Sequence, residues 1–366
     1  MNKTKNKYHP PSRIMGSLAI ILLNSLLLFH SVYSSHAISQ PSDHGKQNRE
    51  IVVISKDSTK HFKDSMSPVG YDGSISATQP FPEWLADFTY LKEWPGIDPP
   101  YVPLSFIDMN QIPNSVPIHE MGACPGDRTG CSFDCHKCVA QDDIYTCPKL
   151  SQSFDDGPSP VTTRLLDNLQ HPTTFFTLGI NVVKYPEIYK QIQAKGHLIG
   201  SHTWGHKFLP SLTNEQIIAE IEWSIWAMNA TGNHIPKWFR PPYGGIDNRV
   251  RHILRLFGLQ AVLWDYDTYD WQLLNNQRTE QQIFDEARSW LASSGGQKRG
   301  MILEHDAHDR TIDVALELSN NIIGHDQLTA AQCVNGVEYI KTFGVDNEEY
   351  AAAAAVNVNE NFIYVS

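Results

Sequence analysis

The sequence lacks an excess of basic residues, and this absence argues against one large class of partner. Its 366 residues include 29 Lys and Arg but 40 Asp and Glu, for a formal net charge of −11. Proteins that bind nucleic acids usually present a basic surface to the phosphate backbone. We therefore expect no nucleic-acid partner. No internal repeat is visible either, so a repeat array is not expected.

Long apolar runs are also scarce, and the one near the start has the features of a secretory signal. Leu18–Phe29 is apolar apart from Asn24 and Ser25, follows a basic start and precedes the small-x-small sequence Ser35-His36-Ala37. The run is short for a membrane span, and an uncleaved anchor is the alternative. We expect residues 1–37 to be a signal peptide. The protein is then secreted, to the extracellular space, cell wall or periplasmic space, without stable membrane insertion.

Cysteine is limited to six residues, which secretion places in an oxidising compartment. Cys333 stands alone, while the other five cluster at Cys124, Cys131, Cys135, Cys138 and Cys147. An even number of exported cysteines favours disulfides, and we predict that Cys147 pairs with Cys333. The remaining four then pair among themselves in an order that the sequence does not decide. Zinc binding by these four is the less favoured alternative, because exported thiols usually oxidise.

Periodic patterns begin near Cys147 and divide the chain. Residues 38–146 form an irregular N-terminal extension, polar at first and rich in Pro and Cys later, and residues 344–366 form a polar tail. Within 147–343, apolar runs of strand length alternate with helical patterns. The expected strands are Thr174–Leu178, His197–Ser201, Lys237–Arg240, Gln260–Trp264 and Met301–Glu304; the expected helices are Val161–Leu169, Tyr185–Ala194, Asn214–Asn229, Asn248–Phe257 and Glu280–Ala292. This alternation predicts an α/β fold with a parallel sheet, either open or closed into a barrel.

Two adjacent carboxylates, Asp155 and Asp156, end a short apolar stretch before Gly157-Pro158. Neighbouring strand residues point to opposite sides, so both can face one site only where the strand ends and the backbone turns. Alone, the triplet Asp-Asp-Gly more often marks a solvated β-turn. The histidines and the other clusters farther along the chain favour a functional site at this turn instead.

His202 and His206 follow the expected strand His197–Ser201 at a spacing that lets both imidazoles reach one cation. A His pair at this spacing is more often structural. Together with a carboxylate from the first cluster, however, it makes three protein ligands with one open position, which is the layout of a catalytic zinc site. Such a metal lowers the pKa of a water at the open position.

Three further clusters also follow strands. Arg240 precedes Pro241-Pro242-Tyr243 and could orient a carboxylate, while a rigid amide nearby could serve as an oxyanion donor. Trp264–Trp271 alternates acids and aromatic residues and could be either a substrate wall or an anchored loop. His305 ends the last strand and could be a general acid.

The five clusters in this order resemble the motifs of the polysaccharide deacetylases, carbohydrate esterase family four, and among them the fungal chitin deacetylases. The resemblance runs from about Cys147 to Asn335. It implies a distorted (β/α) barrel of about seven strands with the irregular, disulfide-containing extension in front. It also implies one divalent metal, most often Zn²⁺, with Co²⁺ possible.

The resemblance implies a role for each matched residue. Those acting in proton transfer and orientation are the base Asp155, the acid His305, Arg240 that orients the base, and Asp267 that tunes the acid. The metal ligands are Asp156, His202 and His206. Substrate and oxyanion contacts come from the Tyr243 amide, Trp271 that walls the acetyl pocket, and Leu303 beside the acetyl methyl.

The expected reaction is hydrolysis of N-acetyl groups in chitin or chitin oligosaccharides, giving chitosan and acetate. The alternatives are deacetylation of peptidoglycan or acetyl-xylan, or an inactive protein that binds chitin in the cell wall. Asn229-Ala230-Thr231 is a further expectation, an N-glycosylation acceptor near the end of a helix.

Overall fold

The computed structural model describes residues 75–293 and 299–343. The expected signal peptide at 1–37, the first part of the extension and the tail at 344–366 therefore lie outside the described residues. Within the described ranges, no helix combines the length and the apolar character that a bilayer crossing requires.

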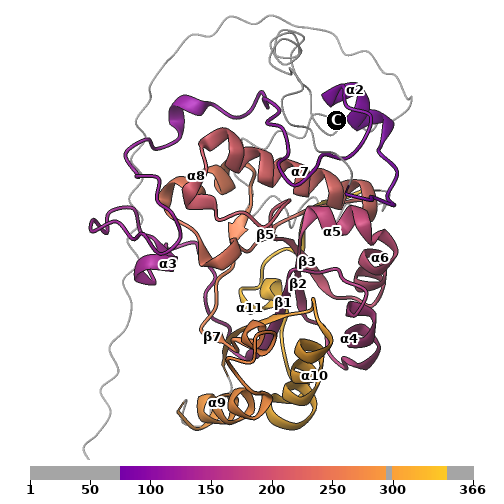
Figure 1. Cartoon of the computed structure of the whole chain (residues 1–366), viewed down its shortest axis with the longest axis vertical. Coiled ribbons are helices and arrows are strands. Elements are labelled where there is room, and N and C mark those ends of the chain that lie inside the picture. The colour runs from indigo at the N-terminus through magenta and orange to yellow at the C-terminus, as the bar shows by residue number, and fades with distance from the viewer. Residues whose placement is uncertain (1–74, 294–298, 344–366) are drawn as a thin grey trace, which may run out of the picture. The chain divides into compact units, whose positions relative to one another are not determined.

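A sheet of seven parallel strands forms the centre of the fold and confirms the expected α/β class (Figure 1). Its order is β6-β5-β3-β2-β1-β8-β7. The strands are β1 (Leu150–Asp155), β2 (Thr174–Thr177), β3 (Leu198–Ser201), β5 (Trp238–Phe239), β6 (Gln260–Ala261), β7 (Tyr266–Asp267) and β8 (Gly300–His305). The sheet curls into a half-barrel, as expected for a distorted barrel of about seven strands. The chain between β6 and β7 spans the opening, because Val262 N–H donates to Phe239 O at 2.8 Å and Asp265 N–H to Met301 O at 3.0 Å.

Helices alternate with the strands, and the sequence patterns predict all of the following α-helices except those at Gly179–Lys184 and Asp309–Glu317. They are α4 (Thr162–Asn168), α5 (Gly179–Lys184), α6 (Pro186–Ala194), α7 (Asn214–Gly232), α8 (Asn248–Leu256), α9 (Glu280–Ser293) and α10 (Asp309–Glu317), with a π-helical turn at Leu318–Ile323. Thr213 and Gln216 form a capping box at the start of α7. Most of α7 is buried, including residues on all of its sides, so it is a central helix and not an amphipathic surface helix.

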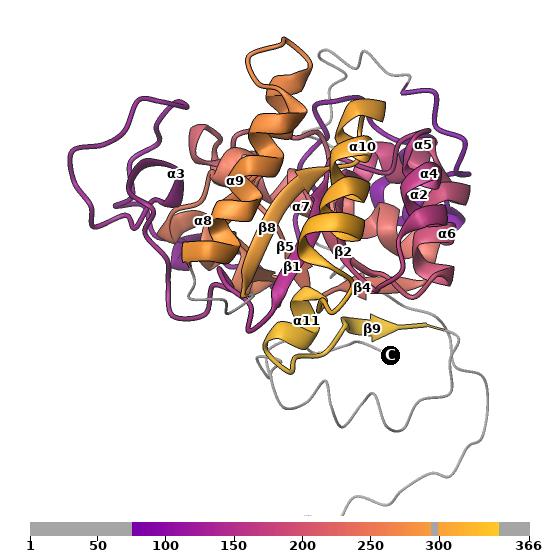
Figure 2. The same cartoon turned by 90° about the horizontal axis from the view of Figure 1, so that it is seen from below.

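A small second sheet and a disulfide close the amino-terminal end of the barrel. In it, β4 (His234–Pro236) pairs antiparallel with β9 (Tyr339–Thr342). Figure 2 shows α11 (Ala330–Cys333) and β9 below the start of β8, opposite its arrowhead. Cys147 is bonded to Cys333, the pairing expected from the sequence. This crosslink therefore lies at the end of the barrel where the strands begin.

The extension packs against the barrel instead of forming a separate core. It contains α2 (Glu83–Thr89), a 3₁₀ turn at Met109–Gln111 and α3 (Phe133–His136). In Figure 1 it runs past α7 and α8 to α3. Its buried side chains belong to the same apolar cluster as the barrel core; they include Leu85, Trp94, Val102, Leu104, Ile112 and Phe133.

Two short disulfides fold the end of the extension. Cys124 is bonded to Cys135, and Cys131 to Cys138. This settles the pairing that the sequence left open and excludes zinc binding by these four residues. His119, Asp134 and Cys135 lie close together, but the Cys135 sulfur is already in a disulfide and does not offer a metal ligand.

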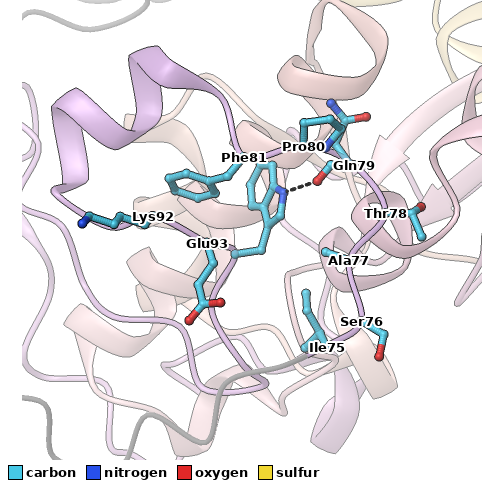
Figure 3. A pocket seen from close by; sticks show the side chains of 10 residues that line it. Ile75, Ser76, Ala77, Thr78, Gln79, Pro80, Phe81, Lys92 and Glu93 are labelled. Carbon is cyan, nitrogen blue, oxygen red and sulfur yellow. Dashed lines mark hydrogen bonds between the residues drawn. The ribbon is translucent and has the colours of Figure 1, made fainter.

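A cavity of about 330 Å³ lies within the extension itself, between residues 75–81 and 92–94 (Figure 3). The dashed line there marks the hydrogen bond from Trp94 Nε1–H to Gln79 O, 2.9 Å long. None of the residues that line this cavity is a predicted site residue. This cavity is therefore separate from the predicted site residues.

Candidate active site

The predicted site residues gather where the parallel strands end, at the mouth of the barrel. Asp155 ends β1 and His305 ends β8, and the two are register partners across the sheet. The loops at this mouth hold several non-glycine residues in the left-handed backbone region: Asp156 (φ 76°), Thr203 (φ 73°), His206 (φ 62°), Tyr243 (φ 59°) and Tyr269 (φ 51°). Such conformations cost energy and persist where the surroundings impose them, which is common at functional sites.

Asp156, His202 and His206 converge on one point. One potential ligand atom from each lies within 4.8 Å of the other two. Asp156 Oδ1 is 3.4 Å from His202 Nε2 and 3.1 Å from His206 Nε2. The three residues come from the turns after β1 and β3, which are joined through β2 in the sheet. The structure therefore brings together the three ligands that the sequence predicts.

The hydrogen bonds behind the two imidazoles show that this group fits a cation. His202 Nδ1 lies 2.7 Å from the carbonyl oxygen of Arg240, which can only accept, so Nδ1 carries the proton. Nε2 of a neutral His202 is then a lone-pair acceptor that faces a carboxylate. Asp156 Oδ1 is buried and has no hydrogen-bond partner. His202 Nε2 and Asp156 Oδ1 are thus two acceptors that face each other at 3.4 Å, an arrangement that a divalent ion completes.

His206 has a different neighbour at its second nitrogen. Its Nδ1 lies 3.1 Å from the hydroxyl of Tyr243, and the two ring centroids are 4.6 Å apart. A partner at Nδ1 fixes the orientation of a metal-binding imidazole. The sequence predicted a role for the Tyr243 amide but gave no signal for its hydroxyl.

Asp155 is held by Arg240. Its Oδ1 accepts a hydrogen bond of 2.9 Å from Arg240 Nη1, and its Oδ2 lies 3.8 Å from His202 Nε2. Asp155 is only 2% exposed and Arg240 is fully buried. Arg240 also donates to Ser153 Oγ at 2.8 Å. A buried carboxylate with one oxygen fixed by a guanidinium is held in one orientation, as a base requires.

The surroundings of Arg240 satisfy the rest of its guanidinium. Nε donates to Val262 O at 3.2 Å and Nη2 to Leu263 O at 3.4 Å. The group stacks over Phe176, 4.2 Å from the ring centroid. Burial lowers the pKa of Arg240, while the charge of Asp155 opposes that change. These contacts hold the Arg240 guanidinium in one position in the barrel interior.

The carboxylate beside His305 differs from the one that the sequence analysis predicted. Asp267 was expected to tune His305, but the carboxylate in contact with His305 is Asp270. Asp270 Oδ1 lies 2.6 Å from His305 Nδ1, and Asp270 Oδ2 accepts from His305 N–H at 2.9 Å. Asp267 instead accepts the Tyr269 N–H at 2.8 Å. Tyr269 has a left-handed backbone, and the 3₁₀ turn that follows it places Asp270 against β8.

The charges around His305 favour its protonated form. Burial lowers the pKa of His305, but the charge and hydrogen bond of Asp270, together with the charges of Asp156 and Asp155, outweigh burial and raise it to about 10. Burial raises the pKa of Asp267 to about 6, although the Tyr269 amide and the His305 charge lower it. His305 is thus suited to donate a proton near neutral pH.

The remaining predicted contacts lie around the same mouth. Leu303 is 5% exposed and, two residues before His305 on β8, projects from the same face of the sheet. Trp271 and Tyr243 are 44% and 52% exposed, so both rings can meet a ligand from solvent. Asp267, on β7, is the register partner of Leu303.

Asn229 does not fit its expected role. It lies inside α7 and is 5% exposed, as is Thr231 of the same acceptor sequence. A glycan on this amide would have to leave through the packed core around the helix. The structure therefore corrects the expectation that Asn229 is glycosylated.

The chain is similar to several known proteins. A family model described as polysaccharide deacetylase matches residues 143–262. Chitin deacetylase 2 of Saccharomyces cerevisiae is 60% identical over 266 residues, covering 72% of this chain and 84% of that protein. Chitin deacetylase 1 of the same organism is 54% identical over 274 residues, covering 74% and 89%. The solved chitin deacetylase of Colletotrichum lindemuthianum matches with a TM-score of 0.49 and 26% identity, covering 53% of this chain and 92% of that one.

Proposed function

This chain belongs to the polysaccharide deacetylase family, and from that premise we propose that it hydrolyses the N-acetyl groups of N-acetylglucosamine units in chitin, giving chitosan and acetate. One observation supports this above the others. A buried, guanidinium-bound carboxylate and a carboxylate-bound histidine are register partners on β1 and β8, beside three converging cation ligands. Amide hydrolysis needs such a base, acid and electrophile within one site.

Asp156, His202 and His206 would hold one divalent cation, for which we propose Zn²⁺, with Co²⁺ as a substitute. When bound, it would supply Lewis acidity to polarise the acetamide carbonyl and to make water a stronger nucleophile. Two imidazoles and one carboxylate form a donor set that zinc favours.

Asp155 is the proposed base. Arg240 fixes its Oδ1, which leaves Oδ2 on the side of His202 to accept a proton from the attacking water. The water oxygen bonds to the carbonyl carbon, and charge develops on the carbonyl oxygen. The Tyr243 N–H is the proposed donor to that oxygen, since Pro241 and Pro242 directly before Tyr243 fix the backbone of its turn.

His305 is the proposed acid. With Asp270 at its Nδ1, the proton on Nε2 is the one left to transfer to the substrate nitrogen. That transfer allows the carbon–nitrogen bond to break, because an amide does not expel an unprotonated amide ion. Acetic acid, which ionises to acetate, and a free amine result. A proton then passes from Asp155 to His305 and restores both residues, so one water is consumed for each acetyl group.

We also propose that the protein is secreted. The support is the predicted signal at 1–37 and the three disulfides, which form in oxidising compartments. Cleavage at Ala37 would be seen as a new N-terminus in protein recovered from culture medium.

The proposed function is tested by acetate release from chitin oligosaccharides, measured beside acetyl-xylan and peptidoglycan. We expect release from chitin, and Asp155→Asn should bind zinc like the unaltered chain yet lose most turnover. Equal turnover by Asp155→Asn would refute the base assignment. Chitin binding without any acetate release by the unaltered, zinc-loaded chain would favour an inactive wall protein instead.

A further inference from the structure

The loop that carries both candidate histidine ligands, residues 202–207, is held between two unrelated parts of the chain. On its inner side is α7. The Trp204 N–H donates to Glu220 O at 2.8 Å, and the Gly205 N–H to Glu220 Oε2 at 2.7 Å. These bonds fix the loop to the central helix.

On its outer side the loop meets residues 94–98 of the extension. The rings of Trp94 and Trp204 stack at 6.1 Å with 24° between their planes. Trp204 Nε1–H donates to Gly96 O at 2.7 Å, and Lys207 Nζ lies 2.8 Å from Asp98 Oδ1. A segment more than a hundred residues away in sequence thus makes stacking, hydrogen-bond and ionic contacts with this one loop.

Gly205 shows how close this approach is. A Cβ on Gly205 would lie 2.7 Å from the backbone oxygen of Ile97, closer than packed atoms come. Backbone cannot swing aside as a side chain can, so any other residue at 205 would separate the loop from the extension. The short distance between Gly205 and Ile97 therefore requires glycine at position 205. This contact with the extension lies directly beside His206 in the sequence.

The two histidines depend on the loop to different degrees. His202 directly follows β3, its side chain is 3% exposed, and its Nδ1 is fixed by a strand-end carbonyl. The His206 side chain is 25% exposed. Its own loop supplies the 3.0 Å bond from His206 N–H to Thr203 Oγ1. The position of His206 therefore follows the position of the loop, which the extension restrains.

We propose that residues 94–98 act as a clamp that positions the metal-binding loop, so that the extension sets the metal affinity of the barrel. This inference rests on the proposed metal site at Asp156, His202 and His206. It gives the extension a role in the chemistry without placing any of its residues among the ligands.

The sharpest test compares Trp204→Phe with Trp223→Phe. Trp223 is equally buried, and its Nε1–H also donates at 2.7 Å to a carbonyl of the extension, that of Pro100. Both changes delete the same kind of bond and the same ring volume. The Trp223 ring meets the Trp94 and Trp204 rings edge-on, but only Trp204 belongs to the loop and stacks face to face on Trp94. Zn²⁺ is titrated into chelator-stripped full chain in competition with an indicator, with His202→Ala as the baseline and the melting temperature measured in parallel.

We expect similar losses of melting temperature from both variants, but a zinc Kd weaker by roughly tenfold only in Trp204→Phe, as for other outer partners of metal ligands. Equal zinc affinity of both variants and the unaltered chain would overturn the clamp. If the unaltered chain binds zinc no more tightly than His202→Ala, the metal site and the proposed function fail with it. That result differs clearly from failure of the clamp alone.

A second pair keeps the test decisive if Trp204→Phe does not fold. Gly205→Ala drives a Cβ against Ile97 O, while Gly232→Ala drives one to 2.7 Å from the Tyr189 ring, at the far end of α7. Weaker zinc binding by Gly205→Ala alone supports the clamp. Equal zinc affinities in both glycine variants contradict it.

Discussion

The two sides of the site use the same residue type in opposite ways. On the metal side, the Nδ1 atoms of His202 and His206 meet an uncharged carbonyl and an uncharged hydroxyl. On the acid side, His305 Nδ1 meets the carboxylate of Asp270. A neutral partner leaves an imidazole whose other nitrogen can bind a cation. A carboxylate makes the imidazole hold a proton that it can later donate.

In this site, the partner at Nδ1 distinguishes the two proposed histidine ligands from the proposed acid. A buried histidine elsewhere, His234, shows what happens without a carboxylate partner. His234 is fully buried, with its Nε2 2.9 Å from the Tyr189 hydroxyl, and burial lowers its pKa to about 4. No carboxylate offsets burial there, whereas Asp270 does so at His305. Environments that push pKa values apart assign acid and ligand roles within one fold.

Removing a metal ligand should have the largest effect. Asp156→Ala or His202→Ala takes away one of only three protein donors, so we expect loss of both stoichiometric zinc and acetate release. Elemental analysis and an acetate assay measure the two together. Full activity in either variant would show that the substituted residue is not a required metal ligand.

Exchanging the partner of His305 should have the next largest effect. In Asp270→Asn the main cause that raises the pKa of His305 is gone while burial still lowers it, so the proton is lost at lower pH. We expect turnover at pH 8 to fall by roughly 100-fold or more, the usual worth of a general acid. The pH profile is the decisive measurement, because the basic limb should move to lower pH.

Asp267→Asn is the matched control for that exchange. It changes an acid three residues away that does not touch His305, and we expect a much smaller fall and an unmoved basic limb. A larger effect at Asp267 than at Asp270 would restore the original assignment from the sequence.

Tyr243→Phe should weaken the metal side more gently. The change removes the hydroxyl at His206 Nδ1 and leaves the backbone amide in place. We expect a zinc Kd raised by about tenfold, with turnover of the zinc-saturated enzyme little changed. Indicator competition measures the affinity, and a loss of turnover at saturating zinc would show that the hydroxyl does more than orient His206.

The smallest effect is expected on folding, at His234. Its folded pKa lies near 4, below the ordinary 6.5, so its contribution to stability is complete above pH 6.5 and is lost as the pH falls towards 4. A shift of this size is worth about 3 kcal/mol at most. His234→Gln should therefore lose less stability than the unaltered chain between pH 6.5 and 4, measured by denaturant unfolding. Parallel curves for both proteins would contradict this.

Much of the barrel could be predicted because its signals are local. Strand-length apolar runs and helical periodicity located β2, β3, β8, α7 and α9 to within a few residues. The metal-ligand spacing could also be recognised, since His202 and His206 share one loop and Asp156 ends a neighbouring strand.

The rest depends on contacts that a linear pattern does not contain. β9 pairs with β4 across about a hundred residues, and neither is long enough to be distinctive. The sequence offers Asp267 and Asp270 as equivalent acids, and only the left-handed Tyr269 between them decides which reaches His305. Likewise, nothing in residues 94–98 indicates that they meet Trp204 and Gly205.

The bond between Cys147 and Cys333 encloses nearly all of the barrel, since the two residues are 186 positions apart. A protease that cuts a surface loop anywhere between them cannot release either fragment. Such a nicked molecule would migrate as one band without reductant and as two with it, and its halves would stay at high local concentration for reassembly.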